Sequence, residues 1–464
     1  MRQYHVAIVG TGPSGFFAAA SLLKAADAWI DADVRVDMVE MLPTPWGLVR
    51  SGVAPDHPKI KSISSQFEKT AADPRVRFFG NITVGDQVQT AELSERYHAV
   101  IYALGAQSDR SLSIPGEDLR GCYAAVDFVG WYNAHPHFAH AAPDLSARRA
   151  VVIGNGNVAI DVARILVTDP TVLGTTDIAD HALDSLHHRA IDEVIISGRR
   201  GPLQSAFTTL ELRELGELTG VDVIVDPGQL AGITEDDLAA ADKSTKQNIA
   251  VLRGYAGRTP RDGHRRIVFR FLSSPIEIRG AGAVESIVFG RNVLVTGADG
   301  AVSARDTGER EEVATQMVVR SVGYRGVPTS GLPFDDHRGI IPNTAGRIAG
   351  SNTEYVVGWI KRGPSGVIGT NKKDAQETVD SLVADLAATA DAGAFVAFPD
   401  DHADALAAWF AARQPKLVTS AHWKLIDQHE RSAGEQQGRP RIKLPKTDDL
   451  LRISHGLGGP NAND

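Results

Sequence analysis

Cysteine is almost absent from the sequence, which contains Cys122 and no second cysteine among its 464 residues. A single thiol cannot form an internal disulfide, and an all-cysteine iron–sulfur cluster or zinc site needs about four thiolates. The same scarcity excludes an enzyme that works through a redox-active cysteine pair. If the chain serves an iron–sulfur cluster, that cluster must therefore belong to another protein.

An excess of positive charge is also missing, because 57 acidic residues outnumber 48 lysines and arginines and give a formal net charge of −9. Nucleic-acid-binding domains are usually strongly basic, so this balance argues against a nucleic-acid partner. No stretch reaches the roughly 18 uninterrupted apolar residues of a membrane span, and the first residues contain no apolar signal core. We therefore expect a cytoplasmic protein with no stable membrane insertion.

Glycine, in contrast, is abundant, with 45 residues, and much of it follows apolar runs. Residues 5–9 predict a buried strand, a glycine turn follows at residues 10–15 with the pattern G-x-G-x-x-G, and an apolar helix comes next. In such a turn Gly10 permits the bend, Gly12 lets a pyrophosphate approach the backbone, and Gly15 allows close packing of helix and strand. The helix N-terminus then favours the phosphate charge. An ordinary strand–helix turn is the alternative for this motif alone.

An acid at the end of the next strand strengthens the first interpretation. Residues 34–39 predict a strand that ends in Glu40. A carboxylate at this position accepts a hydrogen bond from a ribose 2′-hydroxyl. Turn and acid together predict a site for FAD, bound through its ADP half.

A second glycine turn lies at residues 154–159, with the pattern G-x-G-x-x-A, after an apolar strand at residues 150–153. The following strand, residues 193–198, ends in Arg199 and Arg200, where the first motif has an acid. Paired guanidinium groups suit a 2′-phosphate, so this site is predicted to bind NADP(H) rather than NAD. A solvated pair in a loop is the alternative interpretation of the two arginines.

The order of the motifs predicts an α/β fold with two Rossmann-like dinucleotide-binding domains of the glutathione-reductase-like kind, the NADP domain inserted into the FAD domain. A strand at residues 98–105 closes the first segment, and one at residues 317–323 closes the second. We therefore expect an FAD domain in two parts, residues 1–108 and 324–464 with a C-terminal extension, around an NADP-binding domain at residues 109–323.

Four stretches of the sequence also carry a family resemblance: residues 9–15, 45–58, 154–159 and 358–366. They resemble the adrenodoxin-reductase-type ferredoxin–NADP reductases, and within that family the actinobacterial, mycobacterial-type members. The second and fourth stretches are long and specific, and the resemblance covers nearly the whole chain. It implies an FAD flavoprotein oxidoreductase of electron transport, which takes hydride from NADPH onto FAD and passes single electrons to a ferredoxin-type iron–sulfur protein.

The resemblance also implies which residues bind the cofactors, and it implies no metal ligand. Those expected at FAD are Gly12, Ser14, Gly15, Glu40, Leu48, Val84, Trp359, Gly366, Val367 and Ile368. Those expected at NADP(H) are Asn155, Gly156, Asn157, Val158, Arg199, Arg200, Glu211 and again Gly366. Core packing is the alternative role for Leu48, Val84 and Val367.

Catalytic groups are harder to predict, because hydride transfer mainly needs stacked geometry and exclusion of water. The resemblance implies that His57 and Glu214 lie near the flavin and the nicotinamide, with Asp161 as a supporting partner. A structural loop histidine is the alternative role of His57. The solvated face of a helix is the alternative for Glu214.

The expected partner is an acidic ferredoxin-type protein, which an overall charge of −9 would repel. Residues 251–280 contain seven arginines against two acidic residues, and such a basic patch would steer an acidic partner. A solvated face of a β-rich segment is the alternative. The sequence leaves the oligomeric state open.

Three other functions are alternatives to this one. A disulfide reductase needs a cysteine pair. A flavin monooxygenase shows F-x-G-x-x-x-H between its glycine turns, whereas Phe128 and His135 are separated by one residue too many. A non-enzymatic NADPH sensor would bind the nucleotide without bleaching a bound flavin.

Overall fold

The computed structural model describes residues 2–29, 32–366 and 368–456. The chain divides into two compact units. Unit 1 comprises Met1–Ser108, Asn133–Pro136 and Tyr324–Asp464, and unit 2 comprises Asp109–Tyr132 and His137–Gly323. None of the helices in the described ranges has the length and apolar character that crossing a bilayer requires.

Unit 1 is built on a sheet of eight strands in the order β16-β17-β18-β4-β1-β2-β3-β19. The strands are β1 (Arg2–Val9), β2 (Ala32–Val39), β3 (Val76–Gly80), β4 (Ala99–Tyr102), β16 (Asn343–Thr344), β17 (Arg347–Ile348), β18 (Glu354–Val356) and β19 (Val418–Thr419). The five central strands from β18 to β3 run parallel, while β16, β17 and β19 add antiparallel edges. The glycine turn that follows β1 therefore lies at the carboxyl end of the parallel strands, where open α/β sheets bind ligands.

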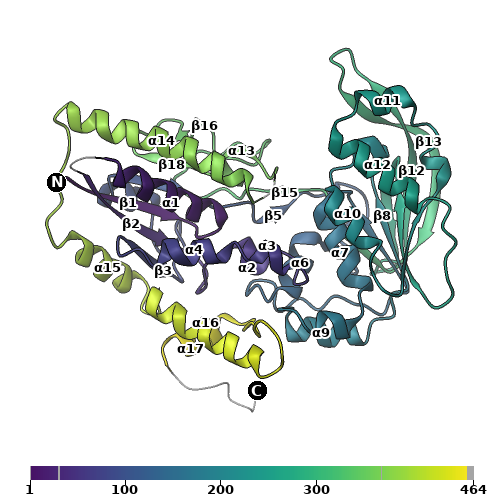
Figure 1. Cartoon of the computed structure of the whole chain (residues 1–464), viewed down its shortest axis with the longest axis horizontal. Helices are drawn as coiled ribbons and strands as arrows, with labels where there is room; N and C mark the ends of the chain where they lie inside the picture. Colours follow the sequence, from purple (N-terminus) through teal and green to yellow (C-terminus); the bar gives the residue numbers. More distant parts are fainter. Residues whose placement is uncertain (1, 30–31, 367, 457–464) are drawn as a thin grey trace. The chain divides into compact units, whose positions relative to one another are not determined.

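Both faces of this sheet are buried, which explains why β1 is apolar without alternation. Val6 and Ile8 pack on one face with α1 (Pro13–Asp27), α4 (Ser64–Ala71) and α14 (Thr370–Asp391). Figure 1 shows α14 beside α1. Ala7 and Val9 pack on the other face with α5 (Thr90–Arg96) and α15 (His402–Arg413). The remaining helices of unit 1 are α2 (Leu48–Ser51), α3 (Pro58–Lys61), α13 (Trp359–Arg362), α16 (Ser420–Glu435) and α17 (Thr447–Ser454).

Unit 2 is built on a wholly parallel sheet in the order β6-β14-β7-β8-β10-β9. Its strands are β6 (Cys122–Ala124), β7 (Arg149–Ile153), β8 (Glu193–Ser197), β9 (Val221–Val225), β10 (Arg265–Arg270) and β14 (Met317–Arg320). An antiparallel sheet of β11 (Ser273–Arg279), β12 (Ser286–Thr296) and β13 (Val302–Ala314) packs on it. The helices are α6 (Ala125–Tyr132), α7 (Asn157–Val167), α8 (Pro170–Leu173), α9 (Asp180–His187), α10 (Thr209–Leu215), α11 (Glu235–Ala240) and α12 (Lys243–Tyr255), with short 3₁₀ turns at Pro202–Gln204 and Pro227–Gln229.

The predicted α/β class with two Rossmann-like units is confirmed. Both predicted strand–turn–helix motifs are present, as β1 with α1 and as β7 with α7. The chain passes between the units near β5 (Ser108–Asp109) and β15 (Tyr324–Arg325). Unit 1 also takes in residues 133–136, which no sequence pattern had separated from the segment around them.

Candidate functional site

The first glycine turn is shaped by close backbone contacts. Gly10 has φ of +100°, and a Cβ there would lie 2.4 Å from the carbonyl oxygen of Ala103. A Cβ on Gly15 would lie 2.1 Å from the carbonyl oxygen of Gly10. Gly12, at the start of α1, has only the Cα of Gly47 near its missing side chain, at 3.9 Å, and no side chain caps the helix. The helix N-terminus therefore lies open beside a turn that only glycine can form, which suits a pyrophosphate.

Glu40 holds the same turn in place. Its Oε2 accepts hydrogen bonds from the backbone N–H of Thr11 at 3.0 Å and from Thr11 Oγ1 at 2.7 Å, while Oε1 accepts from the N–H of Leu42 at 3.1 Å. Burial raises the pKa of this carboxyl, and these hydrogen bonds oppose the shift. Glu40 thus has a structural role that the sequence did not predict, and its contact with a ribose stays a prediction.

The stretch at residues 45–52 lies directly against the turn. The N–H of Trp46 donates to the carbonyl of Thr11 at 3.0 Å, and a Cβ on Gly47, with φ of +49°, would lie 2.8 Å from the Cα of Gly12. Leu48 opens α2 and is 37% exposed, which is unusual for a leucine beside such a tightly packed segment. This exposure leaves Leu48 accessible beside the turn, and its contact with a bound cofactor stays a prediction.

Residues 358–359, at the start of α13, lie against the turn through Gly358. Gly358 has φ of +77°, and a Cβ there would lie 2.1 Å from Ser14 Oγ. The indole of Trp359 stacks on the ring of Tyr324 at 5.6 Å, and its buried Nε1–H has no hydrogen-bond partner among the described residues. An unpartnered buried donor is available to an acceptor on a bound group. The residues present therefore fit a flavin.

The remaining residues expected at FAD have less decisive surroundings. Gly366 has φ of +80°, and a Cβ there would lie 2.6 Å from Thr370 Oγ1. Ile368 is partly buried against the unit 1 core, Val84 is partly buried near Val88 on the opposite face, and Val367 lies outside the described residues. Core packing thus remains the alternative role for Val84.

The second glycine turn repeats the geometry of the first in unit 2. A Cβ on Gly154, with φ of +134°, would lie 2.1 Å from the carbonyl oxygen of Ser321, whereas the space beside Gly156 contains no atom within 4 Å. Helix α7 starts after Gly156 without a side-chain cap. Asn157 Oδ1 accepts from the N–H of Thr208 at 2.8 Å and fixes the neighbouring loop. The turn, with Asn155 and Val158 beside these residues, thus forms an open cradle at a helix N-terminus.

Arg199 and Arg200 follow β8, next to this cradle in the sheet. Their backbone carbonyls are held, because that of Arg199 accepts from Asn292 Nδ2 at 2.8 Å and that of Arg200 from the N–H of Leu272 at 3.1 Å. Neither guanidinium forms an ion pair within the described part of the chain. A fixed loop with two uncompensated cations is well suited to a 2′-phosphate.

Glu211 lies at a buried ion cluster rather than at the surface. Arg164 places one nitrogen 3.4 Å from Glu211 Oε2 and another 2.8 Å from Asp161 Oδ1. Glu214 is half-buried, one turn further along α10, whereas His57 precedes α3 in unit 1. The structure thus brings Asp161 and Glu211 together, and the catalytic roles of His57 and Glu214 stay predictions.

Comparison with known proteins gives this arrangement a family. Residues 4–251 match the family model described as pyridine nucleotide-disulphide oxidoreductase. The chain belongs to the pyridine nucleotide-disulphide oxidoreductase family. It is 71% identical to the NADPH-ferredoxin reductase FprA of Mycobacterium tuberculosis, over 99% of this chain and 100% of that protein. It is 40% identical to the mitochondrial NADPH:adrenodoxin oxidoreductase of Salvelinus fontinalis, over 97% of this chain and 91% of that protein.

Comparison of three-dimensional structures supports the same family. The structure of Mycobacterium tuberculosis FprA in complex with NADPH superposes on this chain with a TM-score of 0.97 at 71% identity. It covers 98% of this chain and 100% of that one. The predicted resemblance to ferredoxin reductases is therefore confirmed.

The single cysteine sets this oxidoreductase apart from family members that reduce disulfides. Cys122 lies on β6 in unit 2, and burial raises the pKa of its thiol to about 11. A thiol with a raised pKa is a poor nucleophile at neutral pH. Neither the count nor the environment of cysteine supports dithiol chemistry here.

Sequence reasoning missed the contacts that tie the C-terminal helices of this oxidoreductase to the 45–58 stretch. Glu430 on α16 has a fully buried side chain and accepts from Arg50 at 2.6 and 2.7 Å and from Arg441 at 3.1 Å. Burial opposes ionisation of Glu430, but the charges of Arg50 and Arg441 hold its pKa below the usual range. Trp423, also on α16, lies against Arg50 at 5.6 Å and Trp46 at 6.2 Å. The sequence signal for this ion pair was a single charged residue, Arg50, inside an otherwise apolar motif.

Three of the seven arginines in the basic patch expected at residues 251–280 pair with acids, whereas Arg253, Arg258, Arg265 and Arg266 form no ion pair within the described residues. Arg261 pairs with Asp222 at 2.6 Å, and Arg270 pairs with Glu311 at 2.5 Å. Arg279 pairs with two further carboxylates. Three of the arginines thus meet acids from outside the window or from its end, and the steering of an acidic partner by the other four stays a prediction.

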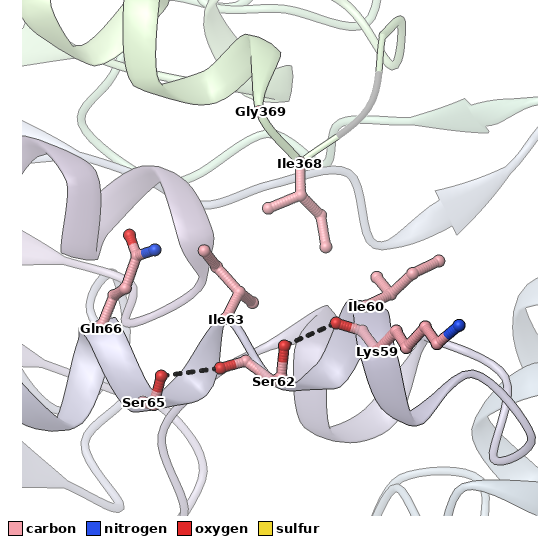
Figure 2. A pocket seen from close by; sticks show the side chains of 8 residues that line it. All are labelled: Lys59, Ile60, Ser62, Ile63, Ser65, Gln66, Ile368 and Gly369. Atoms are coloured by element: carbon pink, nitrogen blue, oxygen red, sulfur yellow. Dashed lines mark hydrogen bonds between the residues drawn. The ribbon is translucent and has the colours of Figure 1, made fainter.

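A pocket of about 360 Å³ lies in unit 1 between α3, α4 and the start of α14. Its lining is Lys59, Ile60, Ser62, Ile63, Ser65, Gln66, Ile368 and Gly369. Figure 2 shows Ile63 and Ile368 extending into the same space from opposite sides. Two of the lining residues thus belong to the segment that follows the fourth stretch of the family resemblance.

Proposed function

We propose that this chain is an FAD-dependent NADPH:ferredoxin oxidoreductase. The observation that carries the proposal is the presence of two different dinucleotide turns: the strand after the first is followed by Glu40, and the strand after the second by Arg199 and Arg200. They occur in a chain that is 71% identical along 99% of its length to an NADPH-ferredoxin reductase. The reaction needs one site for each cofactor, and the two turns differ in the way that a free ribose and a 2′-phosphate require.

Unit 1 binds FAD in this proposal. Gly12, Ser14 and Gly15 hold the pyrophosphate at the N-terminus of α1, and Glu40 binds the adenosine ribose. The flavin ring lies against Leu48, Trp359 and the loop that contains Gly366, Val367 and Ile368, with Val84 toward the adenine. When bound, FAD accepts a hydride and returns its two electrons singly, which connects a nicotinamide to a one-electron acceptor.

Unit 2 binds NADPH in this proposal. Residues 155–158 hold its pyrophosphate, and Arg199 and Arg200 bind its 2′-phosphate. Glu211, fixed by Arg164, and Gly366 hold the nicotinamide end. We propose that the expected domains at residues 1–108, 109–323 and 324–464 are the two parts of an FAD domain around an NADP domain. The division of the chain into two compact units supports this proposal, with the difference that residues 133–136 fall in unit 1. His57 and Glu214 are the groups that we propose to act near the reacting rings.

The electron acceptor is a ferredoxin-type iron–sulfur protein. The relatives' names point to iron–sulfur proteins, and this chain has one cysteine, so the cluster is carried by the partner. We further propose that the partner is acidic and that the protein works in the cytoplasm. Nothing in the sequence or the fold favours a nucleic-acid partner.

Rapid mixing under anaerobic conditions tests this function. The purified holoenzyme is mixed with NADPH or with NADH, and bleaching of the absorbance of the oxidised flavin is followed. We expect fast bleaching with NADPH and slower bleaching with NADH, because only NADPH offers the 2′-phosphate to Arg199 and Arg200. Added ferredoxin then restores the absorbance as it is reduced. Binding of NADPH without bleaching would instead identify a sensor.

A further inference from the structure

Asn292 is a buried polar residue on β12, a strand that carries none of the residues expected at either cofactor. It is 3% exposed and is the last buried side chain of the strand, between the exposed Arg291 and Val293. The pairing of β12 with β13 shifts register between Gly290 and Asn292, and such an irregularity re-aims a side chain. A buried amide costs free energy unless its N–H groups are hydrogen-bonded, so its partners show what it holds.

Both N–H groups of the Asn292 amide are used, and one of them holds the loop that carries the paired arginines. Nδ2 donates to the backbone carbonyl of Arg199 at 2.8 Å and to Ser274 Oγ at 2.8 Å. The backbone N–H of Asn292 donates to the carbonyl of Leu272 at 2.8 Å, and the N–H of Leu272 donates to the carbonyl of Arg200 at 3.1 Å. Asn292 therefore contacts this loop directly at Arg199 and indirectly through Leu272.

The arginine loop, residues 198–201, lies between the second glycine turn and β12. A Cβ on Gly198 would lie 2.7 Å from Nδ2 of Asn155, which belongs to that turn. A Cβ on Gly201 would lie 3.3 Å from Cδ1 of Leu294 on β12. The loop is thus confined on two sides, and its position determines where the two guanidinium groups start relative to the nucleotide turn.

Other hydrogen bonds hold the start of the arginine loop through backbone atoms. The N–H of Gly198 donates to the carbonyl of Arg270 at 2.8 Å, and the carbonyl of Gly198 accepts from the N–H of Ser273 at 3.0 Å. These bonds survive a change of side chain, whereas the bond at Arg199 is lost with the amide of Asn292. Substitution of Asn292 therefore loosens the middle of the loop while its start stays paired.

We infer that Asn292 is a specificity-determining positioning residue, which holds the backbone of Arg199 so that the guanidinium groups of Arg199 and Arg200 meet the 2′-phosphate of NADPH. The inference rests on the proposed function and extends it to a residue outside the expected nucleotide contacts. Guanidinium groups bind a phosphate through several hydrogen bonds of fixed geometry, so a small displacement weakens these bonds together. NADH has a hydroxyl group in place of this phosphate, so its binding does not depend on Asn292.

The test compares two buried asparagines of unit 2, each replaced by leucine, which is similar in size. Asn292→Leu removes the hydrogen bond to the carbonyl of Arg199. Asn248→Leu is the matched control, because Asn248 is 4% exposed and its Nδ2 donates to the backbone carbonyl of Phe207 at 3.0 Å. Both changes remove a buried bond from an amide to a carbonyl, but only Asn292→Leu acts on the arginine loop.

Binding, kinetics and stability are measured on each holoenzyme. Calorimetry gives the Kd of adenosine 2′,5′-bisphosphate, which carries the 2′-phosphate without a nicotinamide. Steady-state assays with a small artificial electron acceptor give KM for NADPH and for NADH, and thermal unfolding gives the midpoint. Asn292→Ala is a second variant, whose smaller side chain admits water to the carbonyl of Arg199, and it carries the test if the leucine variant does not fold.

We expect both Asn292 variants to raise the Kd of adenosine 2′,5′-bisphosphate and KM for NADPH by about tenfold, because the displaced guanidinium groups fit the phosphate less well. KM for NADH should stay within about twofold of the wild-type value. Asn248→Leu should lower the thermal midpoint about as much as Asn292→Leu, since both lose a buried hydrogen bond, and it should change the two KM values by the same factor.

The outcomes separate this inference from the function on which it rests. A loss confined to NADPH and adenosine 2′,5′-bisphosphate supports the inference, because a merely structural role of Asn292 would affect both coenzymes alike. If the wild type prefers NADPH and the Asn292 variants change both KM values by the same factor, or change neither, the inference is overturned and the proposed function stands. If the wild type uses NADH as well as NADPH, the proposed NADP site fails and the inference fails with it.

Discussion

Replacement of Glu430 by glutamine removes the charge at the centre of the buried cluster that ties α16 to the 45–58 stretch. In the wild type the two carboxylate oxygens accept from Arg50, Arg441 and the N–H of Leu444. The Arg50 side chain is 5% exposed, so water cannot replace the lost partner. Breaking a buried ion pair by removing one partner costs about 3–5 kcal/mol, because it leaves an uncompensated charge.

The consequence should reach the flavin site, because Arg50 belongs to α2, which begins at Leu48. A loss of about 4 kcal/mol lowers the thermal midpoint of a unit of this size by about 10 °C. We therefore expect Glu430→Gln to lower the midpoint of the unit 1 transition by this amount and to release FAD more readily on dialysis. The measurements are thermal unfolding followed by circular dichroism and FAD content by absorbance.

Glu435→Gln on the same helix is the control, since Glu435 is exposed and makes no ion pair among the residues described. It should change stability by less than about 0.5 kcal/mol. The advantage of the wild type over Glu430→Gln should be complete above the ordinary glutamate pKa of about 4.3 and disappear as the pH falls through the lower pKa of the folded state. A Glu430→Gln protein as stable and as rich in FAD as the control would refute the reasoning.

Three further predictions concern the nucleotide turn, its specificity and the response to acid. Gly156→Ala should fold with an unchanged thermal midpoint but bind NADPH about tenfold more weakly by calorimetry, because its Cβ meets no atom of the protein and enters the predicted phosphate space. Gly154→Ala should instead be unstable, because its Cβ would lie 2.1 Å from the carbonyl oxygen of Ser321. Arg199→Ala with Arg200→Ala should raise KM for NADPH by about 100-fold in steady-state assays and leave KM for NADH nearly unchanged; equal losses for both would contradict 2′-phosphate recognition. Burial, with the nearby His402 and His98, lowers the pKa of His5 to about 4. The free energy of unfolding should therefore fall as the pH falls from about 6.5 toward 4. In His5→Gln, the thermal midpoint should depend less on pH over this window.

The strand–turn–helix motifs could be predicted, because the same short-range steric contacts determine both their sequence pattern and their backbone geometry. Gly10 and Gly15 follow a strand that is apolar without alternation, and their missing side chains correspond to backbone contacts at 2.4 and 2.1 Å. The same reasoning located the second turn and the helix that follows it. Glu40 was placed correctly at the strand end, but its hydrogen bonds to Thr11 depend on how the turn closes and leave no mark in the sequence.

Ion pairs between residues far apart in the sequence could not be predicted, because no sequence pattern indicates which charged side chains lie close together in the fold. Arg50 and Glu430 are 380 positions apart, and no spacing rule connects them. The arginines at residues 251–280 show the same limit of sequence reasoning. A net charge counted along the sequence ignored Asp222 and Glu311, which arrive from other strands and neutralise two of them. The pocket in unit 1 likewise depends on Ile368 meeting α3 and α4 across about 300 residues of chain.

Electron counting tests the central claim most directly. The holoenzyme is mixed anaerobically with a limiting amount of NADPH and an excess of oxidised ferredoxin, and the absorbances of NADPH and of the iron–sulfur cluster are followed together. One hydride carries two electrons, so the account predicts about two ferredoxin molecules reduced for each NADPH consumed, with no reduction when FAD is removed. Consumption of NADPH without reduction of ferredoxin, or reduction by the protein stripped of FAD, would contradict it.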